Sequence, residues 1–320
     1  MIIVTGAAGF IGSYLCGVLN QQGYNNLVIC DLFRQDREAN LESKKYIRRV
    51  DRNDLMNFID ENHIEIEFIF HIGARTDTTL FDRTLFDELN LNYSKKLWEL
   101  SVKYSLPFIY ASSAATYGDG SLGYDDDHSL VPKLQPLNDY GWSKQWFDMW
   151  VLEQAETPPF WAGFKFFNVY GPNEYHKGRM ASVIFHAFNQ IKSNGALNLF
   201  KSHNPNYSDG GQMRDFIYVK DLCQVLIYFF ETRKHSGIYN LGTGKAETFN
   251  TLGSAVFTAL GKVLNIKYVD TPADIRSKYQ YYTQANTAKL SSAGYQAPFT
   301  SLTEGTIDYV KNYLVNSVRF

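Results

Sequence analysis

The chain has 320 residues, of which 45% are hydrophobic, 20% charged and 16% aromatic, and this composition excludes a disordered or low-complexity protein. Lysine and arginine (31) nearly balance aspartate and glutamate (33), and the net charge of −2 argues against a chain-wide electrostatic grip on nucleic acid. Three scattered cysteines, no basic leader and no long apolar run predict a cytoplasmic protein without a disulfide framework, a metal site or a membrane span.

The first half of the chain alternates short apolar runs with longer helical patterns. Strands are predicted over residues 2–5, 27–31, 66–70, 107–111 and 163–168, and helices over 11–22, 53–61, 84–104 and 140–156. Strands that are apolar throughout, alternating with helices, are typical of a parallel sheet covered on both faces. We therefore expect an α/β fold of Rossmann type, with a doubly wound parallel sheet.

The second half breaks this rhythm. Proline and glycine are frequent over residues 171–214, around one predicted helix at 181–192, and Gly-rich turns mix with amphipathic segments over 235–320. We expect a second, smaller α/β substrate domain fed by several excursions of the chain. The predicted dinucleotide-binding domain is 1–168 with returning segments near 212–235 and 265–287, and the predicted substrate-binding domain is 169–211, 236–264 and 288–320.

A glycine pattern lies between the first predicted strand and the first predicted helix. Gly6, Gly9 and Gly12 form a GxxGxxG sequence. The first glycine permits a tight turn, the second lets the backbone approach a pyrophosphate at the helix N-terminus, and the third lets helix and strand pack closely. The position of the pattern predicts a dinucleotide site.

The residues leave the choice of dinucleotide open. Asp31 ends the second predicted strand, about where an acid that binds the ribose belongs. A carboxylate there favours NAD, because it accepts from the 2′-hydroxyl and repels a 2′-phosphate. Arg34, Arg37 and Arg52 favour NADP, because guanidinium groups hold phosphates well.

A second constellation carries acid and base chemistry. Tyr140 and Lys144 stand four residues apart, so on a helix their side chains share a face. A cation beside a phenol lowers its pKa, which suits a proton-transfer role near neutral pH. The hydroxyl of Ser113 follows the strand predicted at 107–111, and the carboxyl end of such a strand faces the crevice where ligands bind.

At these residues the sequence resembles the extended short-chain dehydrogenase/reductase superfamily, whose members act largely on nucleotide-activated sugars. Further similar stretches are NVYGP at 168–172, RDFIYV at 214–219 and NLGTG at 240–244. The resemblance implies that Ser113 and Tyr140 hydrogen-bond the reacting hydroxyl and that Lys144 holds the nicotinamide ribose. The stretch 113–117 has no carboxylate of the kind that sugar dehydratases use, so we do not expect dehydration.

The runs YHKGRMASVIFH at 175–186 and YQYYTQA at 279–285 resemble the ADP-heptose 6-epimerases of this superfamily. The resemblance implies an isomerase that oxidises and re-reduces C6 of an ADP-heptose for the inner core of lipopolysaccharide. It also implies that Lys177 is a second acid/base opposite Tyr140, and that the protein is a homo-oligomer, by family resemblance a pentamer. The alternatives are a 4-epimerase or reductase of UDP- or dTDP-hexoses, and a regulator that binds NADP without turnover.

The same resemblance distributes the remaining site residues and favours NADP, because Arg37 and Arg52 align with lysines that approach the 2′-phosphate. The chain departs from the family pattern at Ile72, Arg75 and Arg179. The predicted cofactor residues are Gly6, Gly9, Phe10, Ile11, Gly12, Asp31, Leu32, Arg37, Arg52, Ile72, Gly73, Ala74, Arg75, Thr76, Asn90, Tyr140, Lys144, Val169 and Lys177. The predicted substrate residues are Ser113, Asn168, Arg179, His186, Phe200, Lys201, Ser202, His203, Arg214 and Tyr279.

Overall fold

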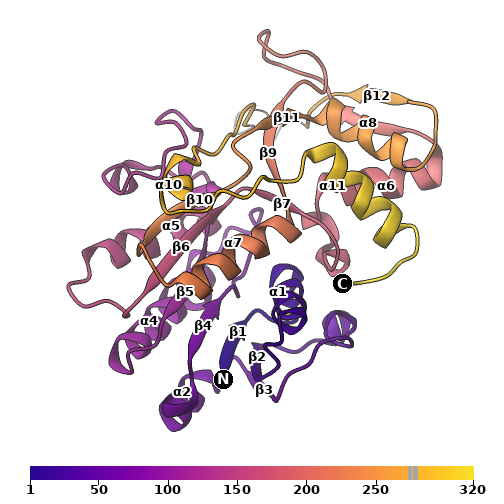
Figure 1. Ribbon diagram of the computed structural model, residues 1–320. Helices are drawn as coiled ribbons and strands as arrows, with labels where there is room; N and C mark the ends of the chain where they lie inside the picture. The colour runs from indigo at the N-terminus through magenta and orange to yellow at the C-terminus, as the bar shows by residue number, and fades with distance from the viewer. Residues whose placement is uncertain (273–275, 277–279) are drawn as a thin grey trace.

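The computed structural model describes residues 1–272, 276 and 280–320. At its centre is a seven-stranded sheet in the order β10-β6-β5-β4-β1-β2-β3, with every neighbouring pair parallel (Figure 1). The predicted doubly wound parallel sheet is therefore confirmed. Its strands are β1 (Ile2–Thr5), β2 (Leu27–Asp31), β3 (Arg48–Asp51), β4 (Phe68–His71), β5 (Phe108–Ser113), β6 (Trp161–Phe166) and β10 (Gly237–Leu241).

Helices cover both faces of this sheet because its strands are apolar on both sides. Ile2 and Val4 belong to the core packed against helices α1 (Phe10–Gln21) and α7 (Val219–Thr232). Ile3, between them in β1, belongs to the opposite core. Side chains of a strand alternate between faces, so one strand contributes to two separate cores. The helices of the second face are α2 (Leu55–Asn62), α4 (Tyr93–Lys103) and α5 (Asp139–Glu153).

One predicted helix is not regular. The stretch predicted at 84–104 consists of α3 (Arg83–Phe86), the π-helical η3 (Asp87–Asn92) and α4 in direct succession. A π-turn rotates the residues that follow it relative to a continuous α-helix, and such turns are frequent at functional sites. The remaining short helices are η1 (Gln35–Asn40), η2 (His63–Glu65), η4 (Ala114–Tyr117), η5 (Val131–Lys133), η6 (Tyr175–Met180) and η7 (Tyr309–Leu314).

A smaller part of the molecule lies beyond one end of the central sheet, at the top of Figure 1. Its three-stranded sheet has the order β11-β9-β7, and a separate parallel pair joins β8 to β12. Helix α8 packs against α6 and α11. The elements are β7 (Asn168–Tyr170), β8 (Leu197–Phe200), β9 (Met213–Tyr218), β11 (Ala246–Thr248), β12 (Ile266–Val269), α6 (Val183–Asn194), α8 (Phe249–Ala259) and α11 (Leu302–Asp308). Helix α10 (Ala288–Ser292) packs instead against β10 of the central sheet.

Two returning segments are placed differently from the predicted domain boundaries. Strand β10 falls within the predicted substrate segment 236–264, but it pairs with β6 at the edge of the central sheet and all five of its residues are buried. Strand β12 falls within the segment 265–287 predicted for the dinucleotide domain, but it pairs with β8. Residue patterns alone do not distinguish these placements, because the pairing partner of a short strand lies far away in the sequence.

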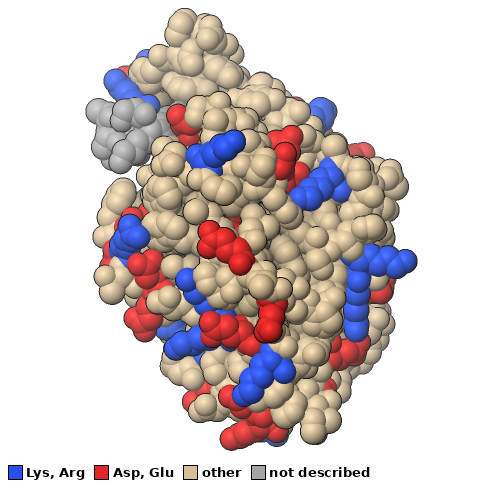
Figure 2. All heavy atoms as spheres, turned by 90° about the vertical axis from the view of Figure 1, so that its left-hand side faces the viewer, with Lys and Arg blue, Asp and Glu red and all other residues tan. Residues whose placement is uncertain are grey.

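The surface mixes both signs of charge. On the face shown in Figure 2, lysine and arginine side chains are interspersed with aspartate and glutamate. All three cysteines are free and buried. In the part of the chain that the structure describes, no helix combines the length and the apolar character needed to cross a membrane.

Candidate active site

The glycine pattern forms a close crossing between β1, α1 and the loop after β4. Gly6 has φ +66°, and a Cβ on it would lie 2.5 Å from Cα of Gly73. A Cβ on Gly12 would lie 2.2 Å from the carbonyl oxygen of Gly6. Gly9 is the N-cap of α1 and has no side chain with which to cap it. The first turn of α1 therefore presents backbone N–H groups to an anion, as the pyrophosphate of a dinucleotide requires.

A buried chain of hydrogen bonds links the strands and the helix next to this crossing. The backbone N–H of Gly73 donates to the Thr5 hydroxyl at 3.0 Å, and that hydroxyl lies 2.8 Å from Nδ1 of His71. Nε2 of His71 lies 2.8 Å from the Ser94 hydroxyl, which donates to the carbonyl of Asn90. Burial lowers the pKa of His71 to about 3, with the charge of Lys144 adding to the effect. The imidazole is therefore neutral and joins β1 to β4 and α4.

The end of β2 offers one carboxylate and two guanidinium groups. Asp31 accepts a hydrogen bond from the backbone N–H of Ala8 at 3.0 Å and lies 3.5 Å from Nη1 of Arg37. Burial raises the pKa of Asp31, and Arg37 opposes that shift. Among the described residues, Nε of Arg37 and Nε of Arg52 are buried and without a hydrogen-bond partner. Donors of this kind suit a phosphate. The exposed Leu32 directly follows Asp31 in the chain.

A cavity of about 340 Å³ lies where the carboxyl ends of the central strands meet the smaller part of the molecule. It brings together the four predicted catalytic residues, Ser113, Tyr140, Lys144 and Lys177, from β5, α5 and η6. Other predicted residues in its lining are Phe10, Ile11, Ile72, Ala74, Thr76, Asn168 and Val169. Residues from separate segments of the sequence thus line one cavity, as in a small-molecule site.

Ser113 is fixed at the end of β5. Its hydroxyl accepts a hydrogen bond from the backbone N–H of Ala115 at 3.1 Å and caps η4. A side-chain hydrogen bond between Ser113 and Tyr140 lowers the pKa of the tyrosine in part. The hydroxyl oxygen has a fixed position and a proton that it can donate.

Tyr140 lies in the first turn of α5, which Asn138 caps by accepting from the N–H of Gly141 at 2.8 Å. Burial raises the pKa of Tyr140 above its usual value, and the charge of Asp148 raises it further. This differs from the expectation that Lys144 lowers the pKa of the phenol. The reason is that the cavity withdraws the phenol from water, which penalises its charged form more than the neighbouring groups compensate.

Lys144 reaches across to the central sheet. Its Nζ donates to the carbonyl oxygen of Ala111 at 2.7 Å. Burial lowers the pKa of Lys144 to about 8, and Asp148 opposes the shift. The side chain is therefore held at the carboxyl end of β5, on the floor of the cavity.

Lys177 lines the same cavity from a different segment of the chain. It belongs to η6, which is broken immediately afterwards by Gly178 at φ 53°. Its Nζ lies 5.4 Å from the ring centroid of Phe10, and burial lowers its pKa while the charge of Glu174 opposes the shift. Glu174 is fully buried and accepts from the N–H and hydroxyl of Ser182 and from the N–H of Gly171. One carboxylate is thus hydrogen-bonded to a residue before and a residue after the segment that carries Lys177.

Some predicted cofactor residues support the site from behind. Asn90 is buried, accepts from the N–H of Arg75 at 2.8 Å, and donates to the carbonyl of Arg75 and the hydroxyl of Ser143 at 3.0 Å. It therefore ties the loop after β4 to α5. The Arg75 side chain is exposed and lies 3.8 Å from Asp77.

Most predicted substrate residues lie outside the lining of the 340 Å³ cavity. Arg179 is exposed, and its carbonyl lies 3.3 Å from Nε2 of His186. Arg214 is buried, donates to the carbonyls of Met213 and Gln280, and lies 5.8 Å from the ring of Phe249, which does line the cavity. Phe200, Lys201, Ser202 and His203 lie at and after the end of β8. Tyr279 falls outside the described residues.

Several residues that the sequence patterns do not single out belong to the same region. Phe216, Phe249 and Leu252 form an apolar wall of the cavity. Asp148 and Lys165 are both fully buried and form an ion pair. A lysine in the otherwise apolar run of β6 was a signal for the pair, because a buried charge requires a partner. No comparable signal marks the apolar wall, whose residues have the pattern of ordinary core.

Comparison with known proteins matches residues 2–242 to the model of the NAD dependent epimerase/dehydratase family. The chain is 45% identical to an ADP-L-glycero-D-manno-heptose-6-epimerase of Fusobacterium nucleatum, and the match covers 98% of each chain. The crystal structure of the Helicobacter pylori protein of that name is 27% identical, with a TM-score of 0.82 over 97% of this chain and 95% of that one. MoeE5 in complex with UDP-glucose and NAD is 25% identical, with a TM-score of 0.76 over 98% of this chain and 99% of that one.

Proposed function

Because the chain belongs to the NAD dependent epimerase/dehydratase family, we propose that it converts ADP-D-glycero-D-manno-heptose into ADP-L-glycero-D-manno-heptose by epimerisation at C6. The enzyme is an isomerase that uses a nicotinamide dinucleotide. The relatives that share 45% of its sequence over nearly the whole length support this substrate. We place the product in the supply of heptose for the inner core of lipopolysaccharide.

The observation that carries the proposal is the presence of Tyr140 and Lys177 in the lining of one cavity. An epimerase that oxidises and re-reduces a single carbon must deliver hydride to either face of the transient ketone. Each orientation of the ketone requires its own proton donor. Tyr140 comes from α5 and Lys177 from η6, so the two groups reach the same space from different elements.

In the proposed mechanism, one of these two groups takes the proton of the C6 hydroxyl while hydride leaves C6. A nicotinamide dinucleotide, which the first turn of α1, Arg37, Arg52 and Lys144 would hold, would supply the hydride acceptor and donor. Ser113 donates a hydrogen bond to the reacting oxygen and holds it beside the phenol. The ketone then turns over in the cavity, hydride returns to the opposite face of C6, and the other group returns the proton. Burial lowers the pKa of Lys177 and raises the pKa of Tyr140, so it favours the neutral form of both groups.

We infer NADP as the preferred dinucleotide. The close glycine crossing and the first turn of α1 fit the pyrophosphate, and the buried Nε atoms of Arg37 and Arg52 suit a 2′-phosphate. Asp31 accepts from Ala8 and faces Arg37, so part of its capacity to bind a ribose hydroxyl is already used. We propose that Lys144, which donates to the carbonyl of Ala111, binds the nicotinamide ribose.

The proposed division of labour assigns the dinucleotide to the central sheet and the sugar nucleotide to the smaller part of the molecule. The mixed composition of the cavity lining supports it, since residues of β5 and α5 face residues of α6 and α8. We propose a homo-oligomer, a pentamer by family resemblance, that acts in the cytoplasm on a small-molecule substrate. Light scattering of the purified protein measures the assembly.

The test of the function is an assay of the purified protein with both ADP-heptose epimers, followed by nuclear magnetic resonance. Interconversion of the two epimers is expected, with UDP-glucose and dTDP-glucose unchanged at C4. Epimerisation of the hexoses alone would establish the alternative 4-epimerase. If the protein binds NADP but turns over none of these substrates, the alternative of a non-catalytic regulator would be supported.

A further inference from the structure

An ion pair is buried directly behind the catalytic residues. Nζ of Lys165 lies 2.6 Å from Oδ2 of Asp148, and both side chains are fully buried. Lys165 comes from β6 and Asp148 from α5. The Asp148 carboxylate also accepts from the hydroxyls of Tyr110 at 3.1 Å and Ser112 at 2.7 Å. Both carboxylate oxygens therefore have partners.

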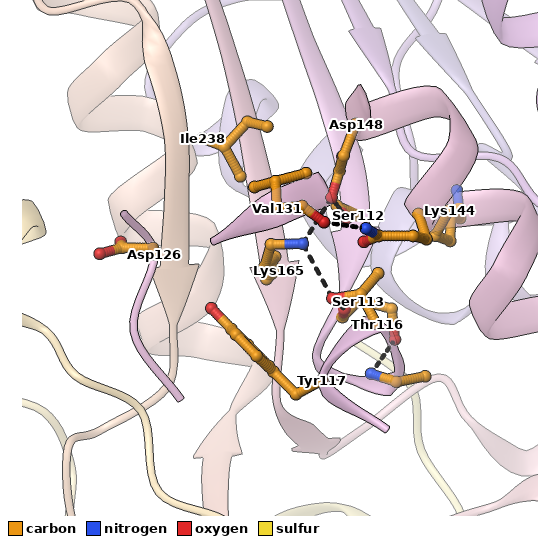
Figure 3. A network of polar contacts seen from close by, with 12 residues as sticks. Ser112, Ser113, Thr116, Tyr117, Asp126, Val131, Lys144, Asp148, Lys165 and Ile238 are labelled. Carbon is orange, nitrogen blue, oxygen red and sulfur yellow. Dashed lines mark hydrogen bonds and ion pairs between the residues drawn. The ribbon is translucent and has the colours of Figure 1, made fainter. Parts of the chain in front are cut away.

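The network extends from the ion pair to Ser113. Nζ of Lys165 donates to the hydroxyl of Thr116 at 2.8 Å, and that hydroxyl donates to the carbonyl of Ser113 at 2.8 Å. Figure 3 shows Lys165 between Asp148 and Thr116, with Ser113 and Lys144 beside them. Asp148 and Lys144 are four residues apart in α5, so they lie on the same face of that helix.

Stability does not require charges at this place. Removing two charges from water costs several kcal/mol per ion, and well-packed apolar residues often replace a buried ion pair without loss of stability. The pair therefore calls for another explanation. Its position supplies one. The pair joins α5, which carries Tyr140 and Lys144, to β6. Hydrogen bonds from the pair through Ser112 and Thr116 reach β5, which carries Ser113.

We propose that Asp148 and Lys165 are positioning residues of the active site, whose ion pair holds the end of β5 that carries Ser113 against the helix that carries Tyr140 and Lys144. The inference rests on the proposed function only in that epimerisation is the measured activity. Neither residue lines the cavity, so neither contacts substrate. Each acts through the groups that do.

The pair also balances charge at the site. The negative charge of Asp148 raises the pKa of both Tyr140 and Lys144. The ammonium group of Lys165 is paired with that carboxylate and opposes its charge. Loss of either partner therefore leaves a charge of one sign close to both groups. The ionisable groups around Asp148 are Tyr110 on β5, Lys165 on β6, Tyr140 and Lys144 on its own helix, and Tyr117 and His128 in the segments that follow β5.

The experiment compares Lys165→Met, Asp148→Asn and the double variant with the wild-type enzyme. We expect kcat for epimerisation to fall about tenfold or more in each single variant, because small displacements of catalytic groups are costly. KM and the dissociation constant for NADP should stay within about twofold, since neither residue lines the site. Lys165→Arg, which keeps the charge, should recover part of the lost kcat.

The pH profile separates positioning of these groups from a purely structural effect. Lys165→Met leaves the negative charge of Asp148 unpaired, which raises the pKa of Tyr140 and Lys144 further. The alkaline limb of the pH dependence of kcat should therefore move to higher pH by roughly half a unit or more. Asp148→Asn leaves a positive charge and should move that limb to lower pH. The double variant removes both charges, so its limb should return toward the wild-type position while kcat stays low.

Asp221→Asn is the matched control. Asp221 is a buried carboxylate on α7 that accepts from the N–H and the hydroxyl of Thr300, outside the cavity lining. It should lower the melting temperature without changing kcat or the pH profile. If Lys165→Met does not fold, the nearly isosteric Asp148→Asn carries the same test. A wild-type enzyme inactive on ADP-heptose would overturn the proposed function, whereas an active wild type with unchanged kcat and unchanged alkaline limb in both single variants would overturn this inference.

Discussion

Tyr140 differs from the other residues of the cavity in that its expected contribution is confined to proton transfer. In a Tyr140→Phe enzyme we expect epimerisation to fall by about 10²–10⁴, the usual contribution of a general acid or base. NADP affinity should remain within a few-fold, because the ring and its packing near Phe86 are kept. Turnover and isothermal titration measure the two quantities. Near wild-type turnover by this variant would contradict the assigned role.

Lys177 distinguishes an epimerase with two acid/base groups from one with a single group. Lys177→Met should block interconversion of the epimers as Tyr140→Phe does, with a loss of about tenfold at the least. Each variant keeps one acid, so with an aldehyde analogue of the substrate one can oxidise and the other reduce. Mixing the two inactive proteins should therefore restore dismutation of the analogue.

The control for that experiment is Lys192→Met, which removes an exposed lysine near the end of α6. It should leave both reactions unchanged. Epimerisation by Lys177→Met at more than about a tenth of the wild-type rate would show that Lys177 only binds substrate and that Tyr140 acts alone.

The choice of dinucleotide is expected to depend on two arginines. Arg37→Met and Arg52→Met should each weaken NADP binding about tenfold or more, the typical effect of losing a charge-assisted hydrogen bond. Binding of NAD, which lacks the 2′-phosphate, should change little. Isothermal titration of each variant with both dinucleotides decides this. Equal losses for NAD and NADP would mean that the arginines only support the loop after β2.

At this scale the sequence predicts the residues whose chemistry is unusual for their setting. Sequence patterns and family resemblance together single out Ser113, Tyr140, Lys144 and Lys177, and the fold places all four around one cavity. Their roles stay predictions. The raised pKa of Tyr140 was not predicted, because the burial of its phenol depends on neighbours such as Phe86 that only the fold brings close.

Among the elements, η6 is held in an unusual way, by one carboxylate at both of its ends. Glu174→Gln should keep the shape of the side chain but place an amide against the donors of Ser182 and Gly171. A buried donor left without an acceptor costs about 1–3 kcal/mol. We expect a lower melting temperature and a loss of epimerisation, because the segment that carries Lys177 is no longer fixed.

The NADP affinity of Glu174→Gln distinguishes an effect on η6 from an effect on the cofactor site. This affinity should stay within about threefold if α1 and the glycine crossing are undisturbed. Thr300→Ala, which removes a hydroxyl hydrogen bond to Asp221, is a control for stability loss elsewhere. A variant that keeps full activity despite a lower melting temperature would show that Lys177 does not need this clamp.

The sequence predicted elements well where their pattern is local. Strands β1 and β2 have the predicted bounds, and α1 differs by one residue at each end. Strand β3, an exposed edge with the sequence RRVD, was missed because two of its four residues are charged arginines. The π-turn η3 was missed because only contacts made by the fold, such as that of Asn90 with Ser143, reveal it.

For the whole molecule, the sequence predicted two cooperating parts but misplaced two strands between them. The edge strand β10 follows α7 in the chain, and each of its residues pairs with a residue of β6 that lies 75 positions earlier. Local sequence patterns carry no information about a pairing over that separation. The cavity shares this origin. Its apolar wall of Phe216, Phe249 and Leu252 belongs to the smaller part, and it becomes a wall only when that part covers the central sheet.

His71 gives the folding of the whole chain a dependence on pH, because it is buried at the junction of β1, β4 and α4. Its pKa is about 3 in the folded protein, against about 6.5 in an unfolded chain. Between these values the unfolded state binds one more proton than the folded state, so stability falls as pH decreases from about 6.5 toward 3. The slope from this one group is about 1.4 kcal/mol per pH unit.

Urea unfolding at several pH values between about 7.5 and 4.5 measures this contribution. The wild-type protein should lose stability more steeply below about pH 6.5 than His71→Asn, whose side chain does not titrate. The variant will be less stable at neutral pH, since it cannot bridge both Thr5 and Ser94, so the comparison is between slopes. His235→Asn, which replaces an exposed histidine in a left-handed turn that asparagine tolerates, should retain the wild-type slope. Parallel curves for the wild type and His71→Asn would mean that the imidazole is already charged in the folded protein. Nδ1 of His71 would then donate to the Thr5 hydroxyl instead of accepting from it.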